Sequence, residues 1–438
     1  MDNIRQQTLL EYVHSTKIND NVTWRPNDTN FVDNMSLPIH RWFRFPAGFS
    51  AEWVKKVIKW RLTQQGDNDI TVLDPFAGTG TTILAAEELG IRAYGIEAHP
   101  FIGKIATIKL SWKDVNINNL NTLAMKVLNA AKSKKWELVE YPSLIRRMYP
   151  TNVLEDLNSL RLAWQFYNDD SPESKIIWLA ITAILRQTSN KGTAPWQYVL
   201  PNKKKKTYLS PYLAFQKQIS IMIQDIEYFQ KNARPTGALI QDDIRYTHKI
   251  PSNSVDLIIT SPPYANNYDY ADAVRLELSF WGEVNTWRDL HEKARKYLIR
   301  SCTQHFSYEN VKLEQLLNNL KHTPIYDDLK DVCYKLAEER LKHGGKKKYH
   351  LMVAAYFYDL YLALKNMRRM CKQDCTMAIV IGDSAPYGIY VPVEEWLGRL
   401  AIHVGFNKYY FEKIRDRNIK WKTRKHNVPL KEGILWVR

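Results

Sequence analysis

The segment Ile70-Thr-Val-Leu-Asp-Pro-Phe-Ala-Gly-Thr-Gly-Thr-Thr82 decides the fold class. It begins with a short apolar strand candidate at 70–73 and passes through a glycine-containing loop into an Ala-rich helix candidate at 83–89. Residues 92–96 form a second strand candidate. A strand, a helix and a second strand in this order predict a parallel strand pair joined by a right-handed crossover.

Further strand candidates follow along the chain, at 238–241, 255–260, 376–381, 409–414 and 433–437, with a helix candidate at 393–403. Uninterrupted apolar runs such as 376–381 are typical of strands that helices cover on both faces. Two helix-rich stretches, 113–236 and 282–350, interrupt this pattern. We therefore predict an α/β protein with a doubly wound, mostly parallel sheet, an antiparallel terminal hairpin and two helical insertions.

Charge composition points to a polyanionic partner. The 438 residues include 62 Lys and Arg against 46 Asp and Glu, a formal charge of +16. This excess favours nucleic acid over an anionic membrane, with simple solubility charge as the alternative.

Three basic runs are candidates for phosphate contact, and the alternative for each is a solvated loop. They comprise Lys203, Lys204, Lys205 and Lys206; Lys346, Lys347 and Lys348; and the segment 420–425.

Cysteine content and hydropathy exclude several classes of protein. Four Cys in so long a chain exclude a disulfide scaffold. Cys302 and His305 have CxxH spacing, but no second ligand pair follows at finger spacing, so we predict no metal site. The first residues lack a signal-peptide pattern, and the apolar run at 176–185 is too short to span a bilayer. We expect a soluble, cytoplasmic protein.

The loop after the first strand has the features of a ligand-binding turn. Gly78 and Gly80 would let backbone N–H groups approach a cofactor, and Asp74 stands at the strand end. Glu97, 17 residues beyond Gly80, ends the second strand, where it could accept both hydroxyls of a ribose. The alternative is a structural turn with a solvated glutamate.

The tetrapeptide Ser261-Pro262-Pro263-Tyr264 directly follows the apolar strand candidate at 255–260. Two adjacent prolines leave carbonyl groups without sheet partners and fix the direction of the chain. Ligands of open α/β sheets bind at this edge, so the position favours a site over an ordinary loop.

Together these motifs resemble those of the S-adenosylmethionine-dependent DNA amino-methyltransferases, which implies a Rossmann-like methyltransferase sheet. Glu97 falls at the family's ribose-binding acid and Asp243 resembles its adenine-side acid, with Asp242 as the neighbouring alternative. The segment 40–49 is similar to the motif that closes over the methionine end of the cofactor, its alternative being a plain aromatic core segment. The implied S-adenosylmethionine-binding residues are Phe45, Pro46, Asp74, Pro75, Phe76, Gly78, Gly80, Thr81, Glu97 and Asp243.

The same tetrapeptide suits methyl transfer to an exocyclic amine. The lone pair of such a nitrogen is delocalised into the ring, so acceptors for both N–H groups would favour a more nucleophilic, tetrahedral nitrogen. The hydroxyl of Ser261 and the carbonyl of Pro262 are the natural acceptors, and Tyr264 can stack on the base. A base in duplex DNA must first leave the helix, at a cost of a few kcal/mol.

Within the family, the serine form of this motif is typical of N4-cytosine enzymes, whereas Asp or Asn in its place is typical of N6-adenine enzymes. The resemblance therefore implies a site-specific DNA cytosine-N4 methyltransferase, acting on double-stranded DNA beside a cognate restriction endonuclease or another defence subunit. Methylation at C5 needs a Cys nucleophile, and none of the four Cys follows a proline pair. Adenine N6, an RNA amine and a catalytically silent DNA-binding subunit remain as alternatives.

The predicted organisation has an arm at 1–38, a catalytic domain at 39–112, 237–281 and 351–438, and helical insertions at 113–236 and 282–350. The cofactor loop precedes the SPPY motif, whereas many N4-cytosine enzymes have the catalytic motif first. The insertion at 113–236 is a candidate DNA-recognition region, but this order leaves open which insertion contacts the bases.

Overall fold

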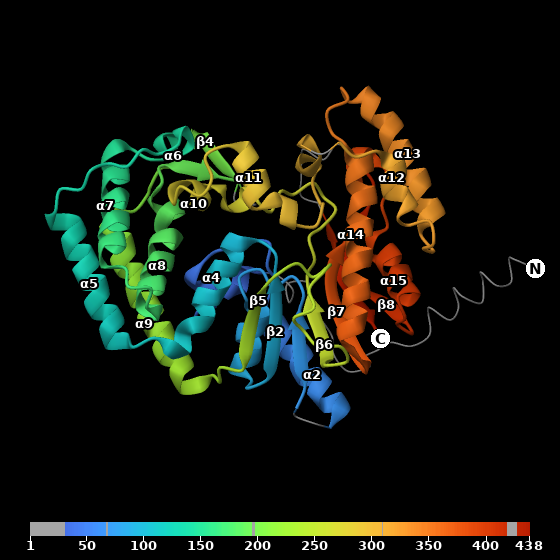
Figure 1. Cartoon of the computed structure of the whole chain (residues 1–438), viewed down its shortest axis with the longest axis horizontal. Helices are drawn as coiled ribbons and strands as arrows, with labels where there is room; N and C mark the ends of the chain where they lie inside the picture. The colour runs from blue at the N-terminus through green and yellow to red at the C-terminus, as the bar shows by residue number, and fades with distance from the viewer. Residues whose placement is uncertain (1–30, 67–68, 195–197, 309, 418–426) are drawn as a thin grey trace, which may run out of the picture.

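The computed structural model describes residues 31–66, 69–194, 198–308, 310–417 and 427–438 (Figure 1). Within these ranges, seven strands form one sheet in the order β5–β2–β1–β6–β7–β9–β8. The strands are β1 (Thr71–Asp74), β2 (Arg92–Glu97), β5 (Gly237–Gln241), β6 (Val255–Thr260), β7 (Cys371–Gly382), β8 (Tyr409–Arg417) and β9 (Leu430–Val437). β9 pairs antiparallel with β7 and β8, and the other neighbours pair parallel, which confirms the predicted sheet with its antiparallel terminal hairpin.

Helices cover both faces of this sheet because consecutive strand residues point to opposite sides. Val72 and Leu257 belong to one hydrophobic core, whereas their neighbours Leu73 and Ile258 belong to another. The first core receives α2 (Ala51–Gln65), α3 (Thr81–Glu88) and α4 (Pro100–Leu110). The second receives α14 (Tyr349–Met370) and α15 (Val393–His403).

Two helical lobes flank the sheet, and its carboxyl edge points toward the region between them (Figure 1). The first lobe contains α5 (Ile117–Ser133), α6 (Ser143–Met148), α7 (Thr151–Tyr167), α8 (Pro172–Thr188) and α9 (Pro211–Asn232), with α10 (Arg275–Phe280) and α11 (Trp287–Lys293) at its upper side. The second lobe contains α12 (Leu313–Asn318) and α13 (Tyr326–Lys342) beside α14 and α15. Short 3-10 helices, among them η2 (His40–Trp42), join these elements.

Two details differ from the sequence prediction. A small hairpin of β3 (Lys191–Thr193) and β4 (Val199–Lys204) lies inside the helix-rich stretch 113–236. The sequence did not predict this hairpin because its strands are short and polar and because Pro201, within β4, has a low propensity for strands. The strand expected at 376–381 begins earlier, at Cys371, because Cys371 pairs with Val255 of β6 before the register shifts and Thr376 pairs with Leu257.

Some predictions concern residues that the structure does not describe. Most of the arm, 1–30, and the third basic run at 420–425 lie outside the described ranges. Among the helices that are described, none is long and apolar enough to cross a membrane.

A buried carboxylate on α9 anchors the chain that leads into the sheet domain. Asp225 accepts hydrogen bonds from the Ile39 backbone N–H at 2.9 Å, from Arg41 Nη2 at 2.6 Å and from Trp42 Nε1 at 2.9 Å. Its side chain is 2% exposed. Because both oxygens are used, the segment 39–42 is fixed against a helix nearly 190 residues away in the sequence.

We expect Asp225→Ala to lower the free energy of unfolding by about 3 kcal/mol, since it leaves an arginine and two buried N–H donors without their partner. Urea denaturation measures this change. The control, Glu227→Ala, removes an exposed carboxylate from the same helix and should cost less than about 0.5 kcal/mol. Equal effects of the two substitutions would contradict the anchoring role.

Candidate active site

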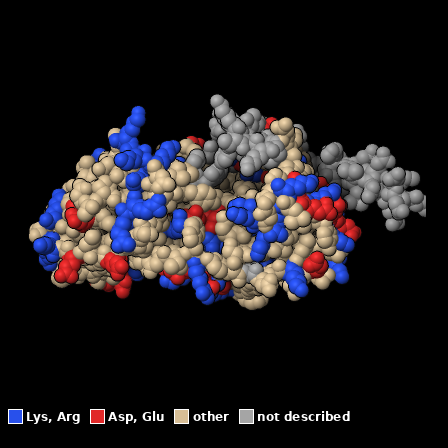
Figure 2. All heavy atoms as spheres, turned by 90° about the horizontal axis from the view of Figure 1, so that it is seen from above, with Lys and Arg blue, Asp and Glu red and all other residues tan. Residues whose placement is uncertain are grey.

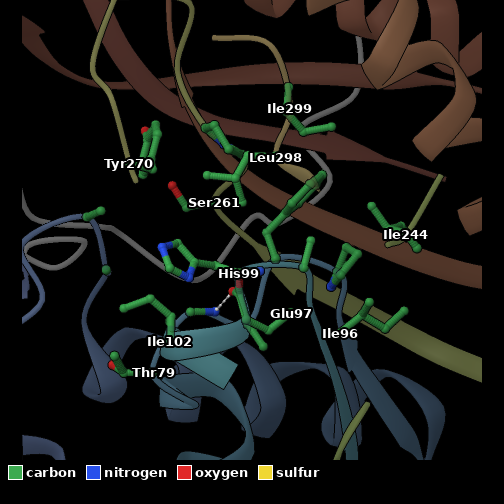
Figure 3. A pocket seen from close by; sticks show the side chains of 18 of the residues that line it. Thr79, Ile96, Glu97, His99, Ile102, Ile244, Ser261, Tyr270, Leu298 and Ile299 are labelled. Carbon is green, nitrogen blue, oxygen red and sulfur yellow. Dashed lines mark hydrogen bonds between the residues drawn. The ribbon is translucent and has the colours of Figure 1, made fainter. Parts of the chain in front are cut away.

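A cavity lies at the carboxyl edge of the sheet, where β1, β2, β5 and β6 end (Figure 3). The predicted site residues that line it are Phe45, Pro75, Phe76, Gly78, Thr81, Glu97, Asp243, Ser261 and Pro263. The neighbouring acid Asp242 lines it as well. The predicted residues outside this lining are Pro46, Asp74, Gly80, Pro262 and Tyr264. The structure therefore brings the two main motifs together around one space.

Asp74 supports this edge from beneath. It is fully buried and accepts hydrogen bonds from Phe76 N–H at 3.1 Å, Thr82 Oγ1 at 2.6 Å and Thr260 Oγ1 at 2.7 Å. Burial raises the pKa of Asp74 to about 6, and these donors act in the opposite direction. Asp74 thus joins the glycine loop and α3 to the last residue of β6, directly before Ser261.

Glu97 lies in the cavity wall at the end of β2. Its Oε2 accepts from the Gly78 backbone N–H at 2.8 Å and its Oε1 from the His99 backbone N–H at 2.7 Å. Burial raises its pKa to about 7. Since a carboxylate oxygen can accept two hydrogen bonds, both oxygens can still receive a ligand hydroxyl.

Gly78 lets the loop approach the opposite wall closely. Its φ of +54° lies in the left-handed region, and a Cβ there would stand 3.5 Å from the Phe45 ring. A side chain at this position would combine backbone strain with loss of space between the loop and Phe45.

The two acids after β5 both reach the cavity and are held differently. The Asp243 carboxylate binds Arg245 through Nε at 2.9 Å and Nη2 at 2.6 Å. Asp242 accepts from the Thr247 hydroxyl at 2.9 Å and pairs with Lys249 at 3.1 Å. The assignment of Asp243 to the adenine side stays a prediction.

Apolar residues that the motifs did not predict complete the wall. Ile96 and Ile244 stand next to Glu97 and Asp243 in the sequence, so adjacency to a predicted acid was an available signal. Leu298 and Ile299 come from the stretch 282–350, where the sequence carries no such signal. Apolar walls suit the ring of a nucleoside, and a neighbouring carboxylate can accept hydrogen bonds from its ribose hydroxyls.

Side-chain hydroxyls hold the SPPY backbone where it leaves the sheet. The carbonyl of Pro263 accepts from the Tyr356 hydroxyl at 2.8 Å, and the Tyr264 N–H donates to the Tyr270 oxygen at 3.1 Å. Ser261 lies between Tyr270 and His99 in the view of Figure 3. No sequence motif predicted these two supporting hydroxyls, although Tyr270 follows the SPPY motif closely, in the segment Tyr268-Asp-Tyr270.

Tyr264 is not among the described residues that line the cavity. The Arg417 guanidinium lies over its ring, 5.0 Å from the centroid. Burial raises the pKa of Tyr264, while a side-chain hydrogen bond with Ser261 acts to lower it. Tyr264 therefore contacts the catalytic serine candidate, and its stacking on a base stays a prediction.

The predicted DNA-binding lysines divide into exposed and internal groups. Lys203, Lys204 and Lys206 are exposed on the first lobe, and Lys346 and Lys347 are exposed between α13 and α14. The other two are engaged: Lys205 Nζ donates to the Arg186 carbonyl at 2.6 Å and Lys348 Nζ to the Phe306 carbonyl at 2.8 Å. Seen from above the carboxyl edge, Lys and Arg side chains are spread over both lobes (Figure 2).

Comparison with known proteins matches this geometry to a family. The model of a DNA methylase family, named for N6 and N4 methyltransferases, matches residues 4–107. Two similar proteins are the type II methyltransferase M.BsoBI of Geobacillus stearothermophilus, 26% identical over 98% of this chain and 91% of that protein, and M.AvaI of Anabaena variabilis, 24% identical over 86% and 81%. These matches support the DNA amino-methyltransferase family for this chain. Type II methyltransferase M.MvaI of Kocuria varians is 21% identical over 97% of this chain and 94% of its own length.

For a DNA amino-methyltransferase, the support of the SPPY backbone has a measurable consequence. We expect Tyr356→Phe to lower turnover about 2- to 10-fold, because one hydrogen bond to the Pro263 carbonyl is lost. Cofactor affinity should not change, since Tyr356 is not part of the cavity lining. Single-turnover kinetics and calorimetry separate the two quantities.

Tyr358→Phe is the matched control, because Tyr358 lies on the same helix two residues further along. A turnover loss of the same size in this variant would contradict a specific role for the Tyr356 hydroxyl.

Proposed function

We propose that the protein transfers a methyl group from S-adenosylmethionine to the exocyclic N4 amine of cytosine in DNA. The observation that carries this proposal is the position of Ser261 on the wall of a cavity that also contains Glu97 and the glycine loop. A hydrogen-bond acceptor for an amine and a nucleoside-sized space thus lie side by side. The serine at the head of SPPY favours cytosine by resemblance to N4-cytosine enzymes.

The cavity fits the proposed cofactor in its chemistry. We propose that Ile96, Phe76 and Ile244 enclose the adenine ring and that Glu97 accepts from the ribose hydroxyls. When bound, S-adenosylmethionine supplies a methyl group already activated on a sulfonium sulfur. The residues of the chain then have to position the partners and exclude water.

At the target base, Ser261 Oγ and the Pro262 carbonyl would accept hydrogen bonds from the two amine N–H groups. This arrangement holds the nitrogen lone pair out of conjugation with the ring and aims it at the methyl carbon. The new N–C bond forms as the S–C bond breaks, and one amine proton leaves to solvent afterwards. A strong base is therefore not required.

The relatives' names support a role in type II restriction and modification. We propose that the protein marks host DNA at a specific sequence against a cognate endonuclease. The region 113–236 is proposed to contribute to DNA recognition, because it forms one of the two lobes beside the carboxyl edge and carries the exposed Lys203 and Lys204.

Nucleoside mass spectrometry after incubation with DNA and S-adenosylmethionine tests the reaction. We expect N4-methylcytosine in DNA, with product formation by Ser261→Ala lowered at least about 100-fold, because the variant loses an acceptor used in the transition state. Binding of S-adenosylmethionine by the variant, measured by calorimetry, should stay within about twofold of the unsubstituted protein.

The alternatives give different products. N6-methyladenine would keep the fold and site but overturn cytosine as the target, and methylated RNA alone would overturn the DNA substrate. Cofactor binding without any modified nucleoside, on DNA containing all short sequence contexts, would favour a silent DNA-binding subunit.

The exposed lysines of the first lobe should contribute to DNA binding through phosphate contacts. We expect replacement of Lys203, Lys204 and Lys206 by Ala to weaken DNA binding and to lower the slope of log affinity against log salt by up to about 3. Replacement of Lys59 on α2 and of Lys408 and Lys413 in and next to β8, all exposed and outside the region 113–236, removes the same charge elsewhere. Identical salt slopes for both triple variants would contradict the assignment.

A further inference from the structure

His99 has two different roles for its two ring nitrogens. It precedes α4, and its Nδ1 accepts a hydrogen bond from the Phe101 backbone N–H at 3.2 Å, which caps that helix. Because the Nδ1 lone pair is used, the proton of the neutral ring must be on Nε2. Burial lowers the pKa of His99 to about 4, so the ring is neutral near pH 7.

The Nε2 atom is a buried donor that faces the cavity. The His99 residue is 3% exposed, and within the described residues its Nε2 has no hydrogen-bond partner. His99 lines the cavity, and Figure 3 shows its ring projecting into the space beside Ser261. A buried N–H without an acceptor is costly, so an acceptor on a bound ligand would satisfy it.

The charged residues around the cavity bear on which ligand group accepts the hydrogen bond from His99 Nε2–H. The charged side chains among its described lining residues are the acids Glu97, Asp242 and Asp243, with no Lys or Arg. A ligand carboxylate would be repelled near those acids and would need neutral donors elsewhere in the cavity. His99 supplies an N–H that adds no positive charge beside a sulfonium.

We propose that His99 Nε2–H donates a hydrogen bond to the methionyl carboxylate of S-adenosylmethionine and so positions that end of the cofactor. This assignment rests on the proposed function, because it requires S-adenosylmethionine in this cavity. It makes His99 a cofactor-positioning residue, in addition to its cap on α4.

The test compares S-adenosylmethionine with decarboxylated S-adenosylmethionine, which keeps the sulfonium and the amine. The variant His99→Asn retains a side-chain oxygen that can cap α4, but its amide is too short to replace Nε2. By calorimetry, we expect the variant to bind S-adenosylmethionine about 10- to 100-fold more weakly and the decarboxylated compound within about twofold of the unsubstituted protein. Its thermal midpoint should be nearly unchanged.

Each other outcome overturns the assignment in a recognisable way. Equal losses for both compounds would mean that His99 acts only through the structure of α4. Unchanged affinity for both, with turnover lowered, would mean that His99 faces the DNA base instead, while the proposed methyl transfer would stand. Absence of any S-adenosylmethionine binding by the unsubstituted protein would overturn the proposed function together with this inference.

Discussion

The arrangement of the site depends on the buried carboxylate of Asp74. Its oxygens bind the glycine loop through Phe76, helix α3 through Thr82 and strand β6 through Thr260. Thr260 directly precedes Ser261, so one side chain fixes both motifs at the same edge of the sheet. Because a buried carboxylate is costly without such donors, the three partners and the acid stabilise one another. The cavity lies between the glycine loop and Ser261, the two parts of the site that Asp74 holds together.

The family's chemistry requires little more than this positioning. A methyl donor bound along the ends of β1 and β2 would meet an amine presented at the end of β6, and neighbouring parallel strands bring these ends together. Beyond the end of β6 the SPPY backbone has no neighbouring strand to bond with among the described residues. The Tyr356 hydroxyl donates to the Pro263 carbonyl instead, and the Tyr270 hydroxyl accepts from the Tyr264 N–H. These two hydrogen bonds hold the SPPY turn in position without a substrate, and such preorganisation lowers the cost of orienting the reacting groups.

Strand candidates and loop motifs were predictable from the sequence because their signals are local. The apolar runs, the glycine loop and Glu97 were each recognisable within a few residues, and the helix expected at 393–403 has those bounds. Contacts such as Leu298 with the cavity depend on how a distant segment packs, and no local pattern encodes that. The role of Asp74 in cofactor binding stays a prediction, and its hydrogen bond with Thr260, a residue 186 positions away, has no local signal in the sequence.

The anchor at Asp225 has a consequence for how the parts of the molecule move. Ile39, Arg41 and Trp42 are tied to α9, and Phe45, three residues further on, forms a wall of the cavity against Gly78. A displacement of the first lobe would therefore be transmitted along a short stretch of backbone to that wall. If DNA binding changes the affinity of the cavity for its ligand through this stretch, thermodynamic reciprocity requires that the ligand change the affinity for DNA by the same factor.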